Sequence, residues 1–182
     1  SIIGIADLIE SRLQSTGGSD PEPIEEQEYY QVSAPQKSLW IAQQATNSGN
    51  SYNIPCSFAI SGNLDIEILE RTLNVILQRH ESLRTIFLLV NGEVKQKILA
   101  ASDYEFSLSQ YPVADEAADE LLAELINKEF VLDRELLFNA DLLCQQSGKY
   151  LLLIQMHHII SDGWSMEVME HEMALVYNQL IH

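Results

Sequence analysis

The spacing of apolar side chains predicts four helices in the body of the chain. The clearest spans residues 64–80. A second begins at Ser33, a good N-cap residue, and runs to about Thr46. Two more are predicted over about 114–130, where a charged face is expected to be solvated, and over 165–180. The apolar side chains of the clearest helix repeat every three or four positions: Ile66, Leu69, Leu73, Ile76 and Leu77.

Strands are predicted between these helices, most of them in two hairpins. Asn91-Gly92 is typical of a tight hairpin turn, and Gln146-Ser147-Gly148 separates a second pair of strands. A single strand that alternates apolar and polar positions is expected to end before Pro112. The predicted strands are residues 56–61, 85–90, 93–99, 104–111, 138–145 and 149–157.

The first 28 residues differ from the rest of the chain. Residues 1–13 place apolar side chains at the spacing of a short amphipathic helix. Residues 14–28 are rich in Ser, Gly, Pro and acidic residues and offer little to bury, so a linker is expected there.

Composition narrows the class of protein. A chain of 182 residues with 46% hydrophobic content can bury one good core, so one domain is expected. A formal charge of -17 argues against nucleic-acid binding, because a phosphate backbone would be repelled. The apolar runs are too short to span a bilayer, and no signal peptide is recognisable. Cys56 and Cys144 lie in strand-like apolar runs and are expected to be reduced. We therefore expect a cytoplasmic protein.

A polar cluster follows the last predicted strand, where the chain breaks into the last helix. Because side chains alternate between the two faces of a strand, only one of His157 and His158 is expected to face a cleft. Gly163 allows a ligand to approach the backbone N–H closely. A backbone donor beside a histidine suits acyl transfer, whereas two histidines in a satisfied turn would not explain the spacing of the whole stretch. The stretch reads Met156-His157-His158-Ile159-Ile160-Ser161-Asp162-Gly163-Trp164-Ser165.

Three segments resemble motifs of the condensation domains of nonribosomal peptide synthetases. Residues 157–163 match the signature HHxxxDG, and the Trp164-Ser165 that follows is typical of the family. Residues 30–40, YQVSAPQKSLW, are similar to its opening segment SxAQxxLW, with Pro35 where alanine is usual. Residues 79–87, RHESLRTIF, match its segment RHExLRTxF.

The resemblance implies an α/β fold. A condensation domain has two lobes like chloramphenicol acetyltransferase, in which a mixed, mainly antiparallel sheet packs with helices. Residues 29–182 resemble the N-terminal lobe. Residues 1–13 would then be the C-terminal helix of an upstream carrier domain, and residues 14–28 the linker that follows it.

The resemblance also implies a reaction. In this family an acceptor aminoacyl thioester attacks a donor aminoacyl or peptidyl thioester through its amine, and a peptide bond forms in a tunnel between the lobes. Both substrates are carried on 4'-phosphopantetheine by partner carrier proteins, so we expect no cofactor bound directly to the chain. Expected partners are the upstream and downstream peptidyl carrier domains, the C-terminal lobe and an adenylation domain. One lobe alone is expected to be inactive.

Five residues receive roles from the resemblance. His158 is expected to be catalytic, binding the attacking amine or taking its proton, and the N–H of Gly163 to stabilise the developing oxyanion. Asp162 is expected to be structural, in an ion pair with Arg84 or, as second choice, Arg79. Its loss would strand a partly buried charge and lower the melting temperature.

The neighbouring residues of the motif receive supporting roles. His157 faces the other way and is expected to be a packing residue or a support for the catalytic one. Ser161 and Trp164 are expected to determine shape and not to react.

Five alternative interpretations are less well supported. An epimerization domain shares HHxxxDG, but the opening residues 33–36 favour condensation, and heterocyclization domains carry DxxxxD instead. A module that docks carriers without turnover is a further alternative. A zinc site is disfavoured because the other histidines show no ligand spacing. A Ser–His–Asp hydrolase is disfavoured because no GxSxG elbow occurs. Those other histidines are His80, His171 and His182.

Overall fold

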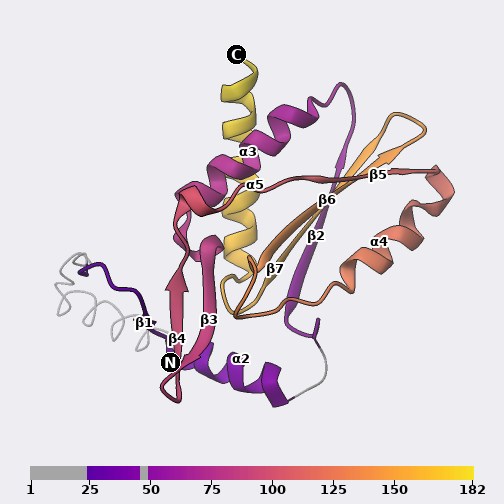
Figure 1. Ribbon diagram of the computed structural model, residues 1–182. Coiled ribbons are helices and arrows are strands. Elements are labelled where there is room, and N and C mark those ends of the chain that lie inside the picture. The colour runs from indigo at the N-terminus through magenta and orange to yellow at the C-terminus, as the bar shows by residue number, and fades with distance from the viewer. Residues whose placement is uncertain (1–23, 46–48) are drawn as a thin grey trace, which may run out of the picture.

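The computed structural model describes residues 24–45 and 49–182, which form two sheets and their covering helices (Figure 1). A three-stranded sheet has the order β1-β4-β3, and a four-stranded sheet has the order β2-β7-β6-β5. The helices are α2 (Ala34–Ala45), α3 (Ile66–Arg79), α4 (Ala118–Ile126) and α5 (Gly163–Ile181). The strands are β1 (Tyr30–Gln31), β2 (Asn53–Ile60), β3 (Thr85–Val90), β4 (Glu93–Ile98), β5 (Ser109–Val113), β6 (Phe138–Gln145) and β7 (Tyr150–His157).

The four-stranded sheet is mixed and mainly antiparallel. β2, β7 and β6 pair antiparallel, and β5 joins the edge of β6 in parallel. Together with the helices, this arrangement confirms the expected α/β fold class. No helix in the described part of the chain is long and apolar enough to cross a membrane.

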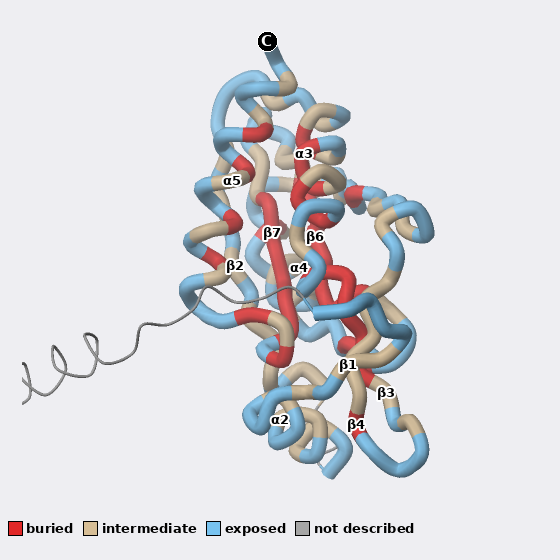
Figure 2. The backbone as a smooth tube through the Cα atoms, turned by 90° about the vertical axis from the view of Figure 1, so that its left-hand side faces the viewer, coloured by how far each residue is buried: buried red, intermediate tan, exposed pale blue. Residues whose placement is uncertain are grey.

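The main core lies between the four-stranded sheet and helices α3 and α5, which pack side by side over one face of the sheet. Leu152, Ile154 and Met156 of β7 point into this core and are almost fully buried. The alternate residues of β7 are buried as well, so both faces of the strand are covered (Figure 2). Burial on both faces explains why the sequence of this strand is almost continuously apolar.

A second, smaller core connects the two sheets to helix α2 at one end of the molecule. Phe87 of β3, Leu137 and Ile159 form its buried centre with Phe130 and Leu132, and Leu39 and Trp40 of α2 pack against it. Ile159 belongs to the polar stretch between β7 and α5, so packing in this second core holds that stretch in place.

Several predicted elements are confirmed. Helix α3 lies within the predicted residues 64–80, with Asp65 as N-cap accepting a hydrogen bond from the backbone N–H of Ile68 at 3.0 Å. Asn91 and Gly92 both adopt positive φ, 52° and 81°, as a tight hairpin turn between β3 and β4 requires. The hairpin of β6 and β7 also forms as predicted.

The strand predicted over residues 104–111 is wrong in its first half. β5 begins only at Ser109, because α3 side chains satisfy the backbone before it: Asn74 exchanges two hydrogen bonds with Phe106, at 2.8 and 2.9 Å, and Glu70 accepts from the N–H of Leu108 at 2.7 Å. Pro112 was expected to break the strand but lies inside it. A proline is tolerated there because β5 is at the edge of the sheet.

The helix predicted over 114–130 is shorter than expected. A 3₁₀ turn at Asp115–Ala117 precedes α4, which ends at Ile126. Side chains from the sheet take the carbonyls at its end: Gln155 donates to the carbonyl of Ile126 at 3.0 Å, and Asn53 to that of Lys128 at 2.6 Å. These side chains substitute for the next helical turn.

Parts of the prediction stay untested. The helix over residues 1–13 and most of the linker over 14–28 lie outside the described residues, and residues 24–28 contain no helix or strand. Cys56 and Cys144 are free and partly buried, and burial raises the pKa of both thiols. Neither thiol is therefore activated for nucleophilic chemistry.

Candidate functional site

The polar stretch forms a tight turn between β7 and α5 that is held by His157. The backbone carbonyl of His157 accepts hydrogen bonds from the N–H of Ile160 at 3.0 Å and from the hydroxyl of Ser161 at 3.1 Å. Its ring Nδ1 accepts from the N–H of Ile159, also at 3.0 Å. Two acceptor atoms of His157 thus receive three hydrogen bonds, one from each of the three residues that follow His158.

The His157 side chain is fully buried. It packs between the rings of Tyr52 and Phe130, with ring centroids 6.2 and 6.5 Å away. Burial, and secondarily the neighbouring His158, lowers the pKa of His157 to about 4. The ring is therefore neutral near pH 7, and because Nδ1 is an acceptor, its proton is on Nε2.

His158 is exposed, in contrast to its neighbour. Its backbone N–H donates to the carbonyl of Tyr52 on the loop before β2 at 2.7 Å, which fixes the position of the main chain. Its Nδ1 lies 2.7 Å from the carbonyl oxygen of Ser161. Since a carbonyl can only accept, Nδ1 carries the proton and Nε2 of the neutral ring keeps a free lone pair. The structure thus presents one histidine as a proton acceptor and buries the other.

Asp162 is the N-cap of α5 and forms no ion pair with any described residue. Its carboxylate accepts from the backbone N–H of Ser165 at 2.9 Å and from the Ser165 hydroxyl at 2.7 Å, and the hydroxyl in turn accepts from the N–H of Asp162 at 3.2 Å. These bonds from Ser165 hold the pKa of Asp162 below its ordinary value. Helix α5 consequently starts at Gly163, two residues before the predicted start.

The expected ion pair of Asp162 with Arg84 or Arg79 is wrong. The Arg84 guanidinium is buried and donates to the carbonyls of Leu77 at 2.9 Å, Gln78 at 3.4 Å and Leu99. Arg79 pairs with Glu172 at 3.3 Å. Arg84 therefore serves the carbonyls that end α3, where no further helical N–H is present to bind them.

Asp162→Ala is expected to destabilise the chain only moderately. Alanine cannot cap α5, and the usual effect of losing an N-cap corresponds to a fall in melting temperature of about 2 to 4 °C for a chain of this size. Asp162→Asn is the matched control, because asparagine caps almost as well without the charge and should restore most of the loss. Thermal unfolding by circular dichroism measures both. A much larger fall that asparagine does not restore would show that the charge itself has a partner.

Gly163 leaves open space in front of the start of α5. A Cβ atom built on it would meet no other atom within 4 Å, and Gly163 is not among the glycines with positive φ. Neither backbone strain nor packing within the described residues therefore requires glycine at this position. Its N–H also has no hydrogen-bond partner within the described residues. Gly163 is also exposed, so this unpaired donor is accessible to a ligand.

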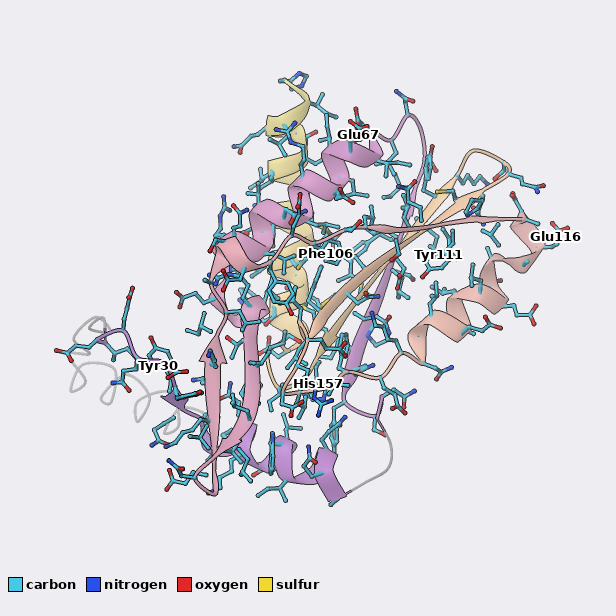
Figure 3. All side chains as sticks on the ribbon, viewed as in Figure 1. Tyr30, Glu67, Phe106, Tyr111, Glu116 and His157 are labelled. Carbon is cyan, nitrogen blue, oxygen red and sulfur yellow. The ribbon has the colours of Figure 1, made fainter. Side chains whose placement is uncertain are left out.

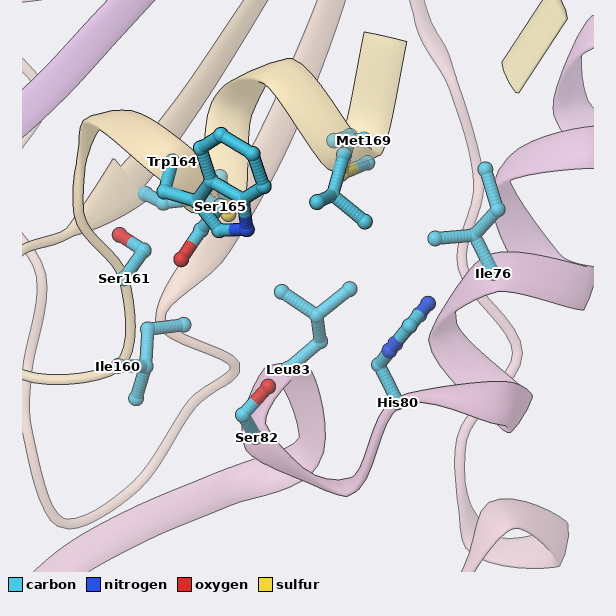
Figure 4. Close-up of a pocket in the computed structure, with 11 residues that line it drawn as sticks. Ile76, His80, Ser82, Leu83, Ile160, Ser161, Trp164, Ser165 and Met169 are labelled. Atoms are coloured by element: carbon cyan, nitrogen blue, oxygen red, sulfur yellow. The ribbon is translucent and has the colours of Figure 1, made fainter. Parts of the chain in front are cut away.

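Trp164 lies beside this space and is 72% exposed, which is unusual for so large an apolar side chain. It borders a pocket of about 170 Å³ between α3, α5 and the 3₁₀ turn Glu81–Arg84 (Figure 4). His80 lines the same pocket, and its Nε2 lies 2.7 Å from Glu172. The lining residues are Ile76, His80, Ser82, Leu83, Met156, Ile160, Ser161, Trp164, Ser165, Val168 and Met169.

Sequence reasoning did not find this pocket. Its apolar lining comes from helix faces that were assigned to the core, and the close approach of α3 to the start of α5 cannot be read from either helix alone.

No group of three or more His, Cys, Asp or Glu side chains within residues 24–45 and 49–182 is placed to hold a metal ion.

Comparison with known proteins identifies a family. Residues 26–182 match the family model described as "Condensation domain". The chain is 35% identical to surfactin synthase subunit 1 of Bacillus subtilis (strain 168) over 178 residues, which is 98% of its length. It is also 37% identical over 177 residues, 97% of the chain, to bacitracin synthase 3 of Bacillus licheniformis. The chain covers only 5% and 3% of the length of these two relatives.

A solved structure shows the same fold. The crystal structure of the starter condensation domain of rhizomide synthetase superimposes with a TM-score of 0.77 at 23% identity, over 85% of this chain and 40% of that one. The described chain thus spans less than half of that solved domain.

Proposed function

Because the chain belongs to the condensation-domain family, we propose that it forms the N-terminal lobe of a domain that joins two carrier-bound aminoacyl groups. The proposal rests chiefly on one observation, the contrast between the two histidines. His158 presents a free Nε2 lone pair at an exposed turn, while His157 beside it is buried and neutral. An exposed proton acceptor fixed at the end of a rigid strand is suited to hold an attacking amine.

In the proposed reaction, the amine of the acceptor aminoacyl thioester attacks the carbonyl carbon of the donor thioester. The new C–N bond forms as the thioester carbonyl becomes an oxyanion, and collapse of this intermediate breaks the C–S bond and releases the donor's pantetheine thiol. Nε2 of His158 binds the attacking amine and takes its proton. The N–H of Gly163 donates to the oxyanion, because it has no hydrogen-bond partner within the described residues and Gly163 is exposed.

Much of the rate enhancement in this proposal comes from positioning. An amine is already a fair nucleophile and a thioester a good electrophile, so holding the two together contributes strongly. Their 4'-phosphopantetheine arms belong to the upstream and downstream carrier domains, and the chain itself needs no cofactor. An adenylation domain of the same synthetase would load the acceptor carrier.

The open side of the site supports a missing partner lobe. Trp164 is largely exposed, and Gly163 before it is exposed as well. A second lobe of the same fold placed there would cover Trp164 and close the site into a tunnel. A single lobe contacts the two thioester substrates from one side only and cannot hold both in the geometry of attack. The isolated chain is therefore expected to bind carriers without turnover.

The experiment compares this chain alone with the chain joined to a second lobe of the family. Each is incubated with a donor carrier and an acceptor carrier loaded with aminoacyl-pantetheine, and mass spectrometry of the carriers detects the dipeptide. We expect dipeptidyl carrier only with two lobes. Dipeptide from the single chain would refute the proposal that it is an inactive half. Carrier binding without product from two lobes would favour a docking module, and inversion of the donor's α-carbon would favour epimerization.

A further inference from the structure

Three polar side chains share the face of the four-stranded sheet that is turned away from α3 and α5. Asn53 of β2 and His157 of β7 are direct partners in the antiparallel register, so they share one face, and Gln155 shares it because it lies two residues before His157. Met156 and Ile154, on the other face, point into the main core. The three polar side chains therefore share one face at the end of the sheet, where Figure 3 labels His157, and two of them bond to the end of α4 and the segment that follows it.

Each of these side chains has one buried polar atom without a hydrogen-bond partner. The atoms are Oδ1 of Asn53, Oε1 of Gln155 and Nε2 of His157. Gln155 and His157 are completely buried, so bulk solvent cannot reach them. A buried polar group left unpaired is destabilising and rare in folded proteins, so three of them on one face call for a partner.

The orientation of all three groups is fixed by their other bonds. The amide nitrogen of Gln155 donates to the carbonyl of Ile126, and that of Asn53 to the carbonyl of Lys128. Turning either amide over would set oxygen against oxygen. Nδ1 of His157 accepts from the N–H of Ile159, so Nε2 carries the ring proton. The unpaired set is therefore one donor and two acceptors.

We propose that one internal water molecule joins these three atoms. Its oxygen accepts from Nε2–H of His157, and its two hydrogens are donated to Oε1 of Gln155 and Oδ1 of Asn53. Internal waters typically make about three hydrogen bonds, which is the number that this set offers.

The water joins a hydrogen-bond network that connects the end of α4 to the turn with the candidate catalytic residue. On one side of the water, Gln155 and Asn53 bond to the carbonyls of Ile126 and Lys128, and on the other side lies the ring of His157. The carbonyl of His157 accepts from the hydroxyl of Ser161, whose own carbonyl accepts from Nδ1 of His158. His157 is thus a positioning residue, and its network sets the tautomer and orientation of His158. The hydrogen bonds that support this positioning role do not depend on the proposed reaction.

The first test is nuclear magnetic resonance of the complete chain with ¹⁵N-labelled histidine. Long-range ¹H–¹⁵N spectra should place the proton of His157 on Nε2, and that proton should show a cross-peak to a long-lived water. A high-resolution crystal structure should show water density about 2.7 to 3.2 Å from all three atoms. A proton on Nδ1, or a dry contact between the three side chains, would overturn the proposal.

The second test asks whether the network positions His158. Gln155→Met keeps the length of the side chain but removes the acceptor and the donor, so the water cross-peak should be lost and the ring ¹⁵N signals of His158 should shift. Gln43→Met is the matched control, because Gln43 is also an amide with an unpaired buried Oε1 but lies on α2. The control should leave the His158 signals unchanged. Unchanged signals in both variants would refute the positioning role, whatever the stability of either.

Discussion

Replacing His158 by alanine in a two-lobe domain that carries this chain lowers the rate of peptide-bond formation by about 10² to 10⁴. The range follows from the loss of a group that positions and deprotonates the amine, while the bound reactants and the N–H of Gly163 remain. The fold should be unaffected, because the side chain is exposed and its one hydrogen bond within the described residues is to the carbonyl of Ser161. Single-turnover kinetics with preloaded carriers measures the chemical step directly.

His171→Ala is the matched control for this experiment. His171 is also an exposed histidine, on α5, but it lies outside the turn and outside the pocket. It should leave the rate within the error of the wild type. Equal rates for the His158 variant and the wild type would remove His158 from the reaction, and a collapsed melting curve would make its role structural.

Features that depend on neighbouring residues could be predicted from the sequence, whereas features that depend on tertiary contacts could not. Helix α3 and the two hairpins follow from periodicity and turn chemistry within a few residues, and they are present. The roles of His158 and Gly163 come from the resemblance, and the structure adds a free Nε2 and an open space that no spacing could show. Strand alternation correctly predicts that only one of the two adjacent histidines is exposed, but the physical reason differs: β7 is buried on both faces and ends at His157, and His158 is exposed because it begins the turn.

The failures concern partners that are distant in sequence. Arg84 was assigned to Asp162 because both stand in motifs, but three carbonyls at the end of α3 and beyond hold its guanidinium. The segment before Ser109 alternates like a strand, yet Asn74 and Glu70 of α3 take its backbone groups. In each case a side chain competes with the expected partner, and only the packed structure decides which bond forms.

The buried His157 should make the stability of the chain depend on pH in a defined window. Its pKa is about 4 in the folded chain, against about 6.5 when exposed by unfolding. Between these values the unfolded chain binds a proton that the folded chain does not, so the free energy of unfolding falls as pH falls from about 6.5 to about 4. The gap of about 2.5 pH units corresponds to a loss of about 3 kcal/mol, a large part of the stability of a domain.

His157→Asn isolates this contribution. Asparagine can keep an acceptor for the N–H of Ile159 but does not titrate, so the variant should be less stable than the wild type near pH 7 and should lack this slope. Urea unfolding of both chains at steps from pH 7 to pH 4 gives the difference, in which carboxylates such as Asp141, whose burial raises its pKa, cancel. The gap between the two chains should shrink by about 3 kcal/mol from pH 7 to pH 4. Parallel curves would mean that the imidazole takes up its proton inside the fold, and the hydrogen bond from Ile159 that shapes the catalytic turn could then not depend on a neutral Nδ1.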